Sequence, residues 1–199
     1  FLADKLKQLD QGLTIAFFFF FRVSEVEMIL PIMLNACQLI NKEEPKARFV
    51  FALTAKTKSL FADNKAKNYI VADNPLFAMA MADIVVVTAG TAALEAALLE
   101  KPMIVCYKTS KLNAFIAKKI LICDFISLPN ILLGKNAVPE LLQTALTPLN
   151  IFKNVFAIKN DKNHYTKMQN NLKTIKAQLL KTEATPLDQL VIKLLKKAD

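Results

Sequence analysis

The sequence predicts an α/β protein built on a doubly wound, mostly parallel sheet with helices on both faces and further helices at the C-terminus. Short apolar runs such as Asp83–Val87 and Pro102–Tyr107 have the length of buried strands and alternate with segments of helical periodicity. The 199 residues are 54% hydrophobic, which is enough for a substantial core. No apolar run approaches the roughly 18 residues of a membrane-spanning helix.

Five strands are expected in chain order, each an apolar run bounded by polar or turn-forming residues. They cover Leu13–Phe21, Arg48–Leu53, Asn68–Val71, Asp83–Val87 and Pro102–Tyr107. Doubly wound sheets bind ligands at the carboxyl ends of their strands. Residues at the carboxyl ends of these runs, such as Arg22, Gly90 and Tyr107, are therefore candidates for function.

Helices are expected between and after the strands. They cover Ser24–Ile40, Pro75–Ala82, Ala92–Leu99, Lys111–Ile122, Pro139–Ala145, Asp161–Leu180 and Leu187–Lys197, and Phe125–Leu133 is expected to be irregular or extended. Ser24 is the expected N-cap of the first helix, with Glu27 placed for a capping box, and Pro31 predicts a kink. We predict one ligand-binding domain over residues 1–150 and basic helices over 151–199.

The turn Thr88-Ala-Gly90-Thr91 is the most informative segment. It joins a buried strand to a helix that is apolar almost all the way round, and Glu95 is the one charge in the first two turns of that helix. Small residues let a ligand approach the backbone, and the free N–H groups and dipole of a helix N-terminus attract phosphate. Alternatively, the turn serves close packing and Glu95 complements its own helix dipole.

Glycine and cysteine usage argue against several kinds of site. The chain has three glycines, too few for Gly-rich dinucleotide or P-loop motifs. The three cysteines lie far apart in apolar segments, at Cys37, Cys106 and Cys123. That spacing is typical of buried reduced thiols, so we expect no metal site.

The formal net charge of +9 comes mainly from lysine, since Arg22 and Arg48 are the only arginines. Lysines are concentrated in residues 151–199. An anionic membrane surface or a phosphorylated lipid fits this charge, and so does nucleic acid, although no aromatic residues alternate with the lysines to favour it. A solvated helical face is the simplest explanation.

Several motifs resemble those of lipid-A-disaccharide synthases in order and spacing. They are Arg22-Val-Ser-Glu25-Val-Glu27, Thr88-Ala-Gly90-Thr91-Ala-Ala-Leu-Glu95, Lys101-Pro-Met-Ile-Val-Cys-Tyr107, Ser127-Leu-Pro-Asn130 through Gly134, and Val138-Pro-Glu140-Leu-Leu-Gln143. The resemblance covers roughly residues 13–146. It implies a GT-B glycosyltransferase, which has two Rossmann-like domains with the active site between them. This chain is similar to the C-terminal half, which binds the nucleotide sugar.

The resemblance also implies roles for individual residues. Arg22 would face the donor diphosphate and Asn130 would lie at the cleft, and these two are the implied catalytic residues. Glu95 would accept hydrogen bonds from the ribose hydroxyls. The implied donor-binding set is Gly90, Thr91, Ala92, Glu95, Glu140 and Gln143. From the sequence alone, Asn130 also fits a purely structural role in the turn after Pro129.

The activity implied by the resemblance is a hexosyl transfer in lipid A biosynthesis, an early part of lipopolysaccharide synthesis. A UDP-linked diacylglucosamine would donate its sugar to diacylglucosamine 1-phosphate, giving a β-1,6 disaccharide, with UDP-sugar as substrate and no cofactor or metal. The expected partners are both lipid substrates, an anionic membrane surface and the N-terminal half of the enzyme, but not nucleic acid. The expected location is the cytoplasmic face of the bacterial inner membrane, and the chain alone is expected to be inactive.

The run Phe17–Phe21 departs from the family's Leu-Leu-Pro-Gly-Ser pattern before Arg22. A phenyl group where the backbone should tighten around phosphate would obstruct the donor site. Two other functions stay open. One is a UDP-sugar epimerase of GT-B fold, which would need acidic and histidine residues at the cleft, whereas the sole histidine, His164, is expected in an exposed loop. The other is a non-catalytic nucleotide- or lipid-binding module.

Overall fold

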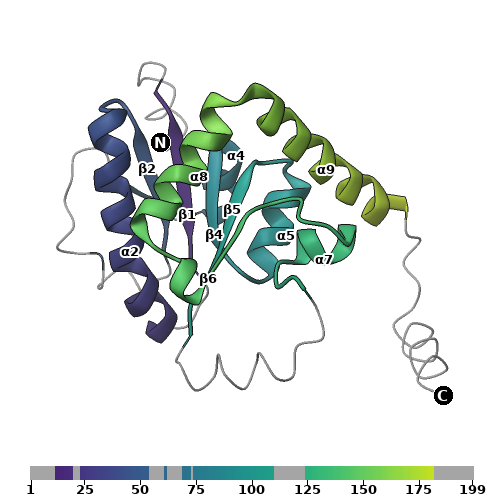
Figure 1. Cartoon of the computed structure of the whole chain (residues 1–199), viewed down its shortest axis with the longest axis horizontal. Helices are drawn as coiled ribbons and strands as arrows, with labels where there is room; N and C mark the ends of the chain where they lie inside the picture. Colours follow the sequence, from purple (N-terminus) through teal and green to yellow (C-terminus); the bar gives the residue numbers. More distant parts are fainter. Residues whose placement is uncertain are drawn as a thin grey trace.

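The structure is a computed structural model of the chain, and it describes residues 12–19, 23–53, 61, 69–72, 74–109 and 124–181. Within these ranges, six parallel strands form one sheet in the order β3-β2-β1-β4-β5-β6 (Figure 1). The strands are β1 (Thr14–Phe18), β2 (Arg48–Ala52), β3 (Tyr69–Ala72), β4 (Ile84–Thr88), β5 (Met103–Tyr107) and β6 (Glu140–Leu142). The expected fold class is confirmed.

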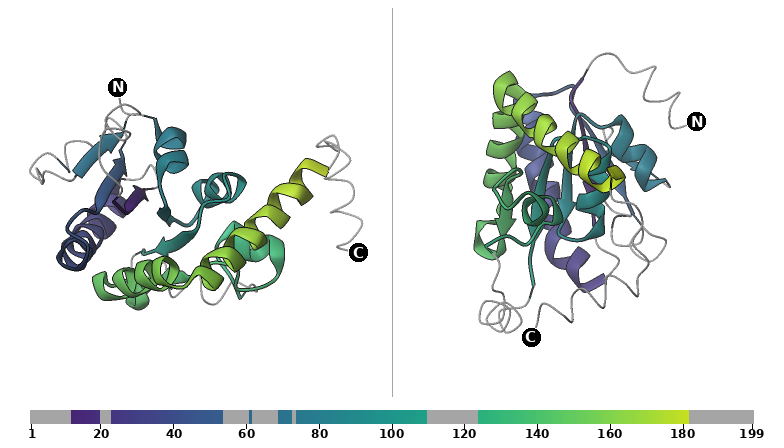
Figure 2. Two further views of the ribbon diagram at one scale, coloured as in Figure 1. Left: turned by 90° about the horizontal axis from the view of Figure 1, so that it is seen from above. Right: turned by 90° about the vertical axis from the view of Figure 1, so that its right-hand side faces the viewer.

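Helices cover both faces of this sheet. They are α2 (Val23–Glu43), α4 (Pro75–Met81), α5 (Thr91–Leu98), α7 (Leu128–Leu133), α8 (Pro148–Asn160) and α9 (Lys162–Lys181), with a 3-10 turn, η1 (Gln143–Ala145), after β6. Seen from above, α2 and α8 lie together on one side of the strands and α4 and α5 on the other (Figure 2, left). Helix α9 continues from α8 and packs against α5 and α7.

The strand order places a topological switch between β1 and β4. The chain builds β1, β2 and β3 outward in one direction, then returns to β1 and builds β4, β5 and β6 in the other. In doubly wound sheets the crevice for ligands lies outside the carboxyl ends of the strands at such a switch. Those ends face the lower side of the molecule in Figure 1, and the turn between β4 and α5 lies there.

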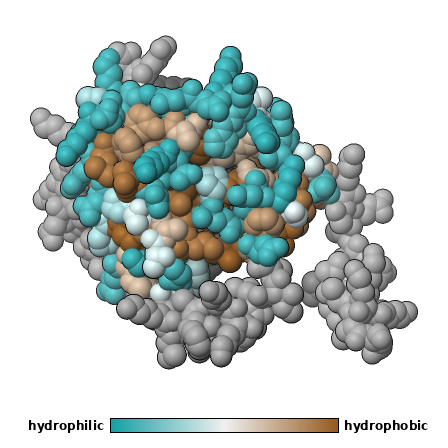
Figure 3. Space-filling view, viewed as in Figure 1, coloured by the Kyte–Doolittle hydropathy of each residue, from teal (hydrophilic) through white to brown (hydrophobic). Residues whose placement is uncertain are grey.

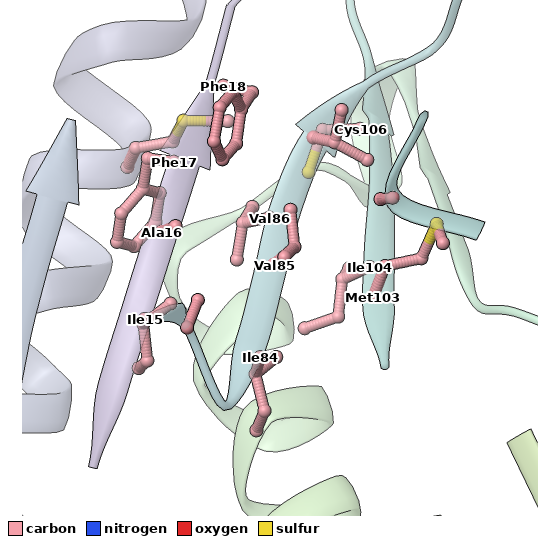
Figure 4. Packing of buried hydrophobic residues seen from close by; sticks show 14 of the residues in the cluster. Ile15, Ala16, Phe17, Phe18, Ile84, Val85, Val86, Met103, Ile104 and Cys106 are labelled. Carbon is pink, nitrogen blue, oxygen red and sulfur yellow. The ribbon is translucent and has the colours of Figure 1, made fainter. Parts of the chain in front are cut away.

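The central strands are buried on both faces, as the near-continuous apolar runs predicted. Side chains of β1, β4 and β5 pack side by side in the core (Figure 4). Phe17 belongs to this core, with its ring stacked on that of Phe51 at a centroid distance of 4.9 Å. The first two phenylalanines of the run at 17–21, Phe17 and Phe18, are therefore ordinary buried strand residues.

The expectations for two segments were wrong, and one helix was missed. The segment expected to be irregular contains α7, because Ser127 accepts a hydrogen bond from Asn130 N and caps the helix, and Gly134 ends it in the left-handed conformation. Residues 139–145 form β6 and η1 rather than a helix, because β6 pairs with β5. Helix α8 was missed despite Thr147 and Pro148, a cap followed by proline at the first helical position.

Smaller differences concern the ends of elements. Strand β1 ends at Phe18 rather than Phe21, and α2 begins at Val23, so Ser24 lies inside the helix instead of capping it. Helix α2 continues through Pro31. The expected helices Lys111–Ile122 and Leu187–Lys197 lie outside the described residues, as does Arg22.

The C-terminal helices share the core of the sheet. Ile151, Val155 and Ile158 of α8 and Leu172 of α9 are buried in the same apolar cluster as the strands. The division of the chain after residue 150 stays a prediction.

Hydrophilic side chains crowd the upper rim in Figure 3, where α8 passes into α9. Among the helices described, none is long and apolar enough to span a membrane.

Candidate functional site

The turn after β4 is built around Gly90. Strand β4 ends at Thr88, and the next residue, Ala89, donates its N–H to Cys106 O on β5 at 2.9 Å. Gly90 follows with φ 148° and ψ −160°, in a region that residues with a side chain rarely adopt. A glycine is therefore required where the chain leaves the sheet and enters α5.

The N-terminus of α5 carries no side-chain cap. Other helices of the described part are capped by side chains, α4 by Asn74, α7 by Ser127 and α8 by Thr147. At α5 the N-cap is Gly90, which offers no side-chain acceptor to the first N–H groups, those of Thr91 and Ala92. Unpaired N–H groups and the helix dipole make this end of α5 suited to an anion.

Two further polar groups at this end of α5 and β4 have no partner among the residues that the structure describes. Glu95 is half-buried one turn into α5, and no residue in the described ranges pairs with its carboxylate. The Thr88 hydroxyl is buried at the end of β4 with no hydrogen-bond partner in that same part of the chain. A buried hydroxyl left unpaired costs about 1–3 kcal/mol. Thr88 begins the turn that the sequence singled out, but it was not among the predicted site residues.

Glu140 has a different environment from Glu95. It begins β6, and its Oε1 accepts hydrogen bonds from Ser127 N at 3.0 Å and from Ser127 Oγ at 2.6 Å. Its Oε2 accepts from Ile126 N at 3.1 Å. The carboxylate therefore ties the residues before α7 to the start of the edge strand.

Asn130 is fully buried and fully hydrogen-bonded within the protein. Its Oδ1 accepts from Ala137 N at 2.8 Å and Val138 N at 2.9 Å. Its Nδ2 donates to Val138 O at 2.9 Å and to Glu140 Oε1 at 2.8 Å. An amide with two donors and two acceptor positions has nothing left for a ligand. The catalytic role implied for Asn130 stays a prediction, and these contacts do not support it.

Gln143 lies at the carboxyl edge, directly after β6. Its φ is 48°, in the left-handed region that non-glycine residues seldom adopt. Its Oε1 accepts a hydrogen bond from Thr109 N, just beyond β5, at 3.5 Å. With the acceptor turned toward Thr109, the Nε2 donor has no partner within the described ranges.

The sequence-predicted site residues thus fall into two groups. Gly90, Thr91, Ala92 and Glu95 lie together at the β4–α5 turn, and Gln143 lies at the same edge of the sheet, whereas Asn130 and Glu140 are bonded within the protein. Burial raises the pKa of the Cys106 thiol, which makes it a poor nucleophile. In the ranges described, no three His, Cys, Asp or Glu side chains could together hold a metal ion.

Comparison with known sequences gives close agreement with one family. Residues 2–193 match the sequence model of the family described as lipid-A-disaccharide synthetase. Lipid-A-disaccharide synthase 1 of Legionella pneumophila (strain Philadelphia 1) is 34% identical over 168 residues, covering 82% of this chain and 44% of the relative. The lipid-A-disaccharide synthase of Sulfurihydrogenibium sp. is 34% identical over 178 residues, covering 82% and 46%. The chain spans less than half the length of these curated relatives.

Solved structures share the fold at low sequence identity. A spinosyn rhamnosyltransferase in complex with thymidine diphosphate gives a TM-score of 0.59 at 14% identity, covering 85% of this chain and 42% of that one. The UDP-GlcNAc 2-epimerase of Neisseria meningitidis bound to UDP-GlcNAc gives 0.53 at 19% identity, covering 91% and 48%. At such identities the likeness concerns the fold alone. The sequence matches decide the family: the chain belongs to the lipid-A-disaccharide synthases.

Proposed function

We propose that this chain is the donor-binding half of a glycosyltransferase that makes the lipid A disaccharide. The main support for the proposal is the N-terminus of α5 at the switch point, with Glu95 one turn further along; among the described residues this end of α5 has no side-chain cap and the Glu95 carboxylate has no partner. The diphosphate of a UDP-sugar would lie against the N–H groups of Thr91 and Ala92. The Glu95 carboxylate would then accept hydrogen bonds from the ribose hydroxyls.

The transfer follows from the substrates of the family. The 6-hydroxyl of diacylglucosamine 1-phosphate attacks the anomeric carbon of UDP-diacylglucosamine. The bond from that carbon to the diphosphate breaks, UDP departs, and the hydroxyl proton passes to a base outside this half of the enzyme. Negative charge grows on the leaving diphosphate, and the N-terminus of α5 would stabilise it. Arg22, which follows β1 in the sequence, would add a positive charge.

The epimerase alternative is weaker. Its support is a likeness of fold at 13–19% identity, against 34% identity to synthases. The sole histidine, His164, lies in the first turn of α9 and not in a loop. Met168, four residues further along α9, accepts a hydrogen bond from Met103 N at the start of β5, so this part of α9 lies at the amino edge of the sheet, away from the β4–α5 turn.

Calorimetry with UDP tests the donor site. Glu95→Ala should weaken UDP binding about tenfold or more, because a hydrogen bond to a charged group contributes about 1.5–3 kcal/mol. Glu43→Ala is the matched control, since Glu43 is an exposed glutamate at the end of α2. Equal UDP affinity in wild type and Glu95→Ala would refute the ribose contact, and absence of UDP binding to the wild-type chain would refute the proposal.

The lipid substrates need an assay of their own. The full-length protein that contains this chain should form the disaccharide from UDP-diacylglucosamine and diacylglucosamine 1-phosphate. Release of UDP without disaccharide would contradict the transferase assignment. So would epimerisation of the donor sugar at C2, the reaction of a 2-epimerase. UDP binding with no turnover of any kind would favour the non-catalytic module.

A further inference from the structure

Ser127, Asn130 and Glu140 form one connected cluster, which we call the β6 clamp. Glu140 Oε1 is its centre, because it accepts from Ser127 N, Ser127 Oγ and Asn130 Nδ2 at 3.0, 2.6 and 2.8 Å. Ser127 and Asn130 are both 0% exposed. Three buried donors on one carboxylate oxygen fix the position of Glu140 far more tightly than a surface contact would.

The β6 clamp determines where β6 lies along β5. The Asn130 side chain binds both backbone polar groups of Val138, accepting from Val138 N and donating to Val138 O. Glu140 is the first residue of β6 and pairs in register with Val105 of β5. The strand has three residues, so its own ladder fixes the register weakly. The buried side-chain bonds of the clamp supply the rest.

The position of β6 in turn places Gln143. Leu142, the last residue of β6, pairs with Tyr107, and Gln143 follows at once in the left-handed conformation. A non-glycine residue stays in that conformation only where its surroundings impose it, because the conformation costs free energy. Such strained residues are common at ligand sites. Its Oε1 accepts from Thr109 N, and no residue in the part of the chain that the structure describes pairs with its Nε2, which is a donor at the carboxyl edge.

We propose that Ser127, Asn130 and Glu140 are positioning residues that do not touch the nucleotide sugar and act by holding Gln143, whose amide donates a hydrogen bond to it. This inference rests on the proposed function and deepens it. It separates Gln143, which contacts the donor, from the three residues of the β6 clamp, which act through Gln143. Glu140 and Asn130 then affect donor affinity only as long as Gln143 is present.

A double-mutant cycle on UDP affinity tests this dependence, using the 199-residue chain and calorimetry. Gln143→Ala should weaken UDP binding roughly fivefold, the loss of one hydrogen bond. Glu140→Gln keeps the side-chain shape but sets an amide N–H against buried donors, and it should weaken binding by a similar factor. The double variant should bind UDP no more weakly than Gln143→Ala alone.

Two controls separate this effect from loss of stability. Asp161→Ala removes a carboxylate that accepts Asn163 N and His164 N at the start of α9, at the opposite edge, and should leave UDP affinity unchanged. If Glu140→Gln does not fold, as judged by circular dichroism, Ser127→Ala takes its place in the cycle, because it deletes only the two bonds that Ser127 Oγ makes, to Glu140 Oε1 and from Asn130 N. A smaller loss with the same dependence on Gln143 is then expected.

The outcomes are distinct. Multiplying losses in the double variant would mean that Glu140 contacts UDP itself and would overturn the inference. Unchanged affinity in Glu140→Gln, or in Gln143→Ala, would overturn it as well. In each case a weakened Glu95→Ala variant would show that the donor site at α5 still stands, so failure of the clamp and failure of the proposed function are told apart.

Discussion

Replacing Asn130 by alanine is expected to destabilise the folded chain by about 3–5 kcal/mol. The substitution removes four hydrogen bonds of 2.8–2.9 Å at a side chain with no exposure. Each bond contributes about 0.5–1.5 kcal/mol net, and each buried group left unpaired costs about 1–3 kcal/mol. The expected loss is a large part of the roughly 5–15 kcal/mol that keeps a domain folded.

Urea unfolding followed by circular dichroism at the helix band measures this loss, since the chain has no tryptophan. Asn154→Ala is the matched control, because Asn154 makes one side-chain bond, to Asn150 O within α8, and should cost about 0.5 kcal/mol or less. Asn130→Asp tests the donors separately, because it keeps the acceptor toward Ala137 N and Val138 N and turns an oxygen toward Glu140. A loss under about 1 kcal/mol in Asn130→Ala would refute the reasoning, because four buried bonds cannot be that weak together.

Three further outcomes are expected. Replacing Phe19–Phe21 by Pro-Gly-Ser should raise both UDP affinity and solubility, and unchanged values of both would remove the run from the donor site. The expected helix Lys111–Ile122 has lysines beside apolar residues, as a helix lying on a membrane surface would. Replacing Lys111, Lys118 and Lys119 by glutamine should weaken salt-sensitive co-sedimentation with anionic vesicles more than tenfold, since each lysine contributes up to about 1 kcal/mol; equal binding to neutral vesicles would contradict this. Burial raises the pKa of Tyr69 from 10.0 to about 12, so the unfolded chain loses its phenol proton first and stability should fall as pH rises from about 10 to about 12. Tyr69→Phe should make that fall in the urea midpoint shallower, and an unchanged slope would count against it.

Strands β1 to β5 and the β4–α5 turn could be predicted from the sequence because their signals are local. A buried parallel strand is a short apolar run, and Ile84–Thr88 and Met103–Tyr107 match the expected runs within one residue at each end. The turn was visible because glycine is rare in this chain and Glu95 is an isolated charge in an apolar helix. Composition and spacing were sufficient for these features.

The region from Ile126 to Gln143 could not be predicted because its structure depends on contacts between segments. Residues 139–145 carry a helical pattern, but pairing with β5 makes part of them a strand. Asn130 and Glu140 are polar residues in apolar surroundings, a pattern shared by ligand-binding and structural groups. The left-handed conformation of Gln143 has no sequence signal, since residues with side chains seldom adopt it.

The central claim is that the N-terminus of α5 holds the diphosphate of a uridine nucleotide. Titration of the nitrogen-15-labelled chain with UDP, followed by amide NMR, tests it most directly. The backbone amide signals of Gly90, Thr91 and Ala92 should shift most, uridine without phosphates should shift them far less, and Glu95→Ala should require more UDP for the same shift. Diphosphate binding at α5 is refuted if UDP leaves these three signals in place and shifts amides elsewhere in the chain.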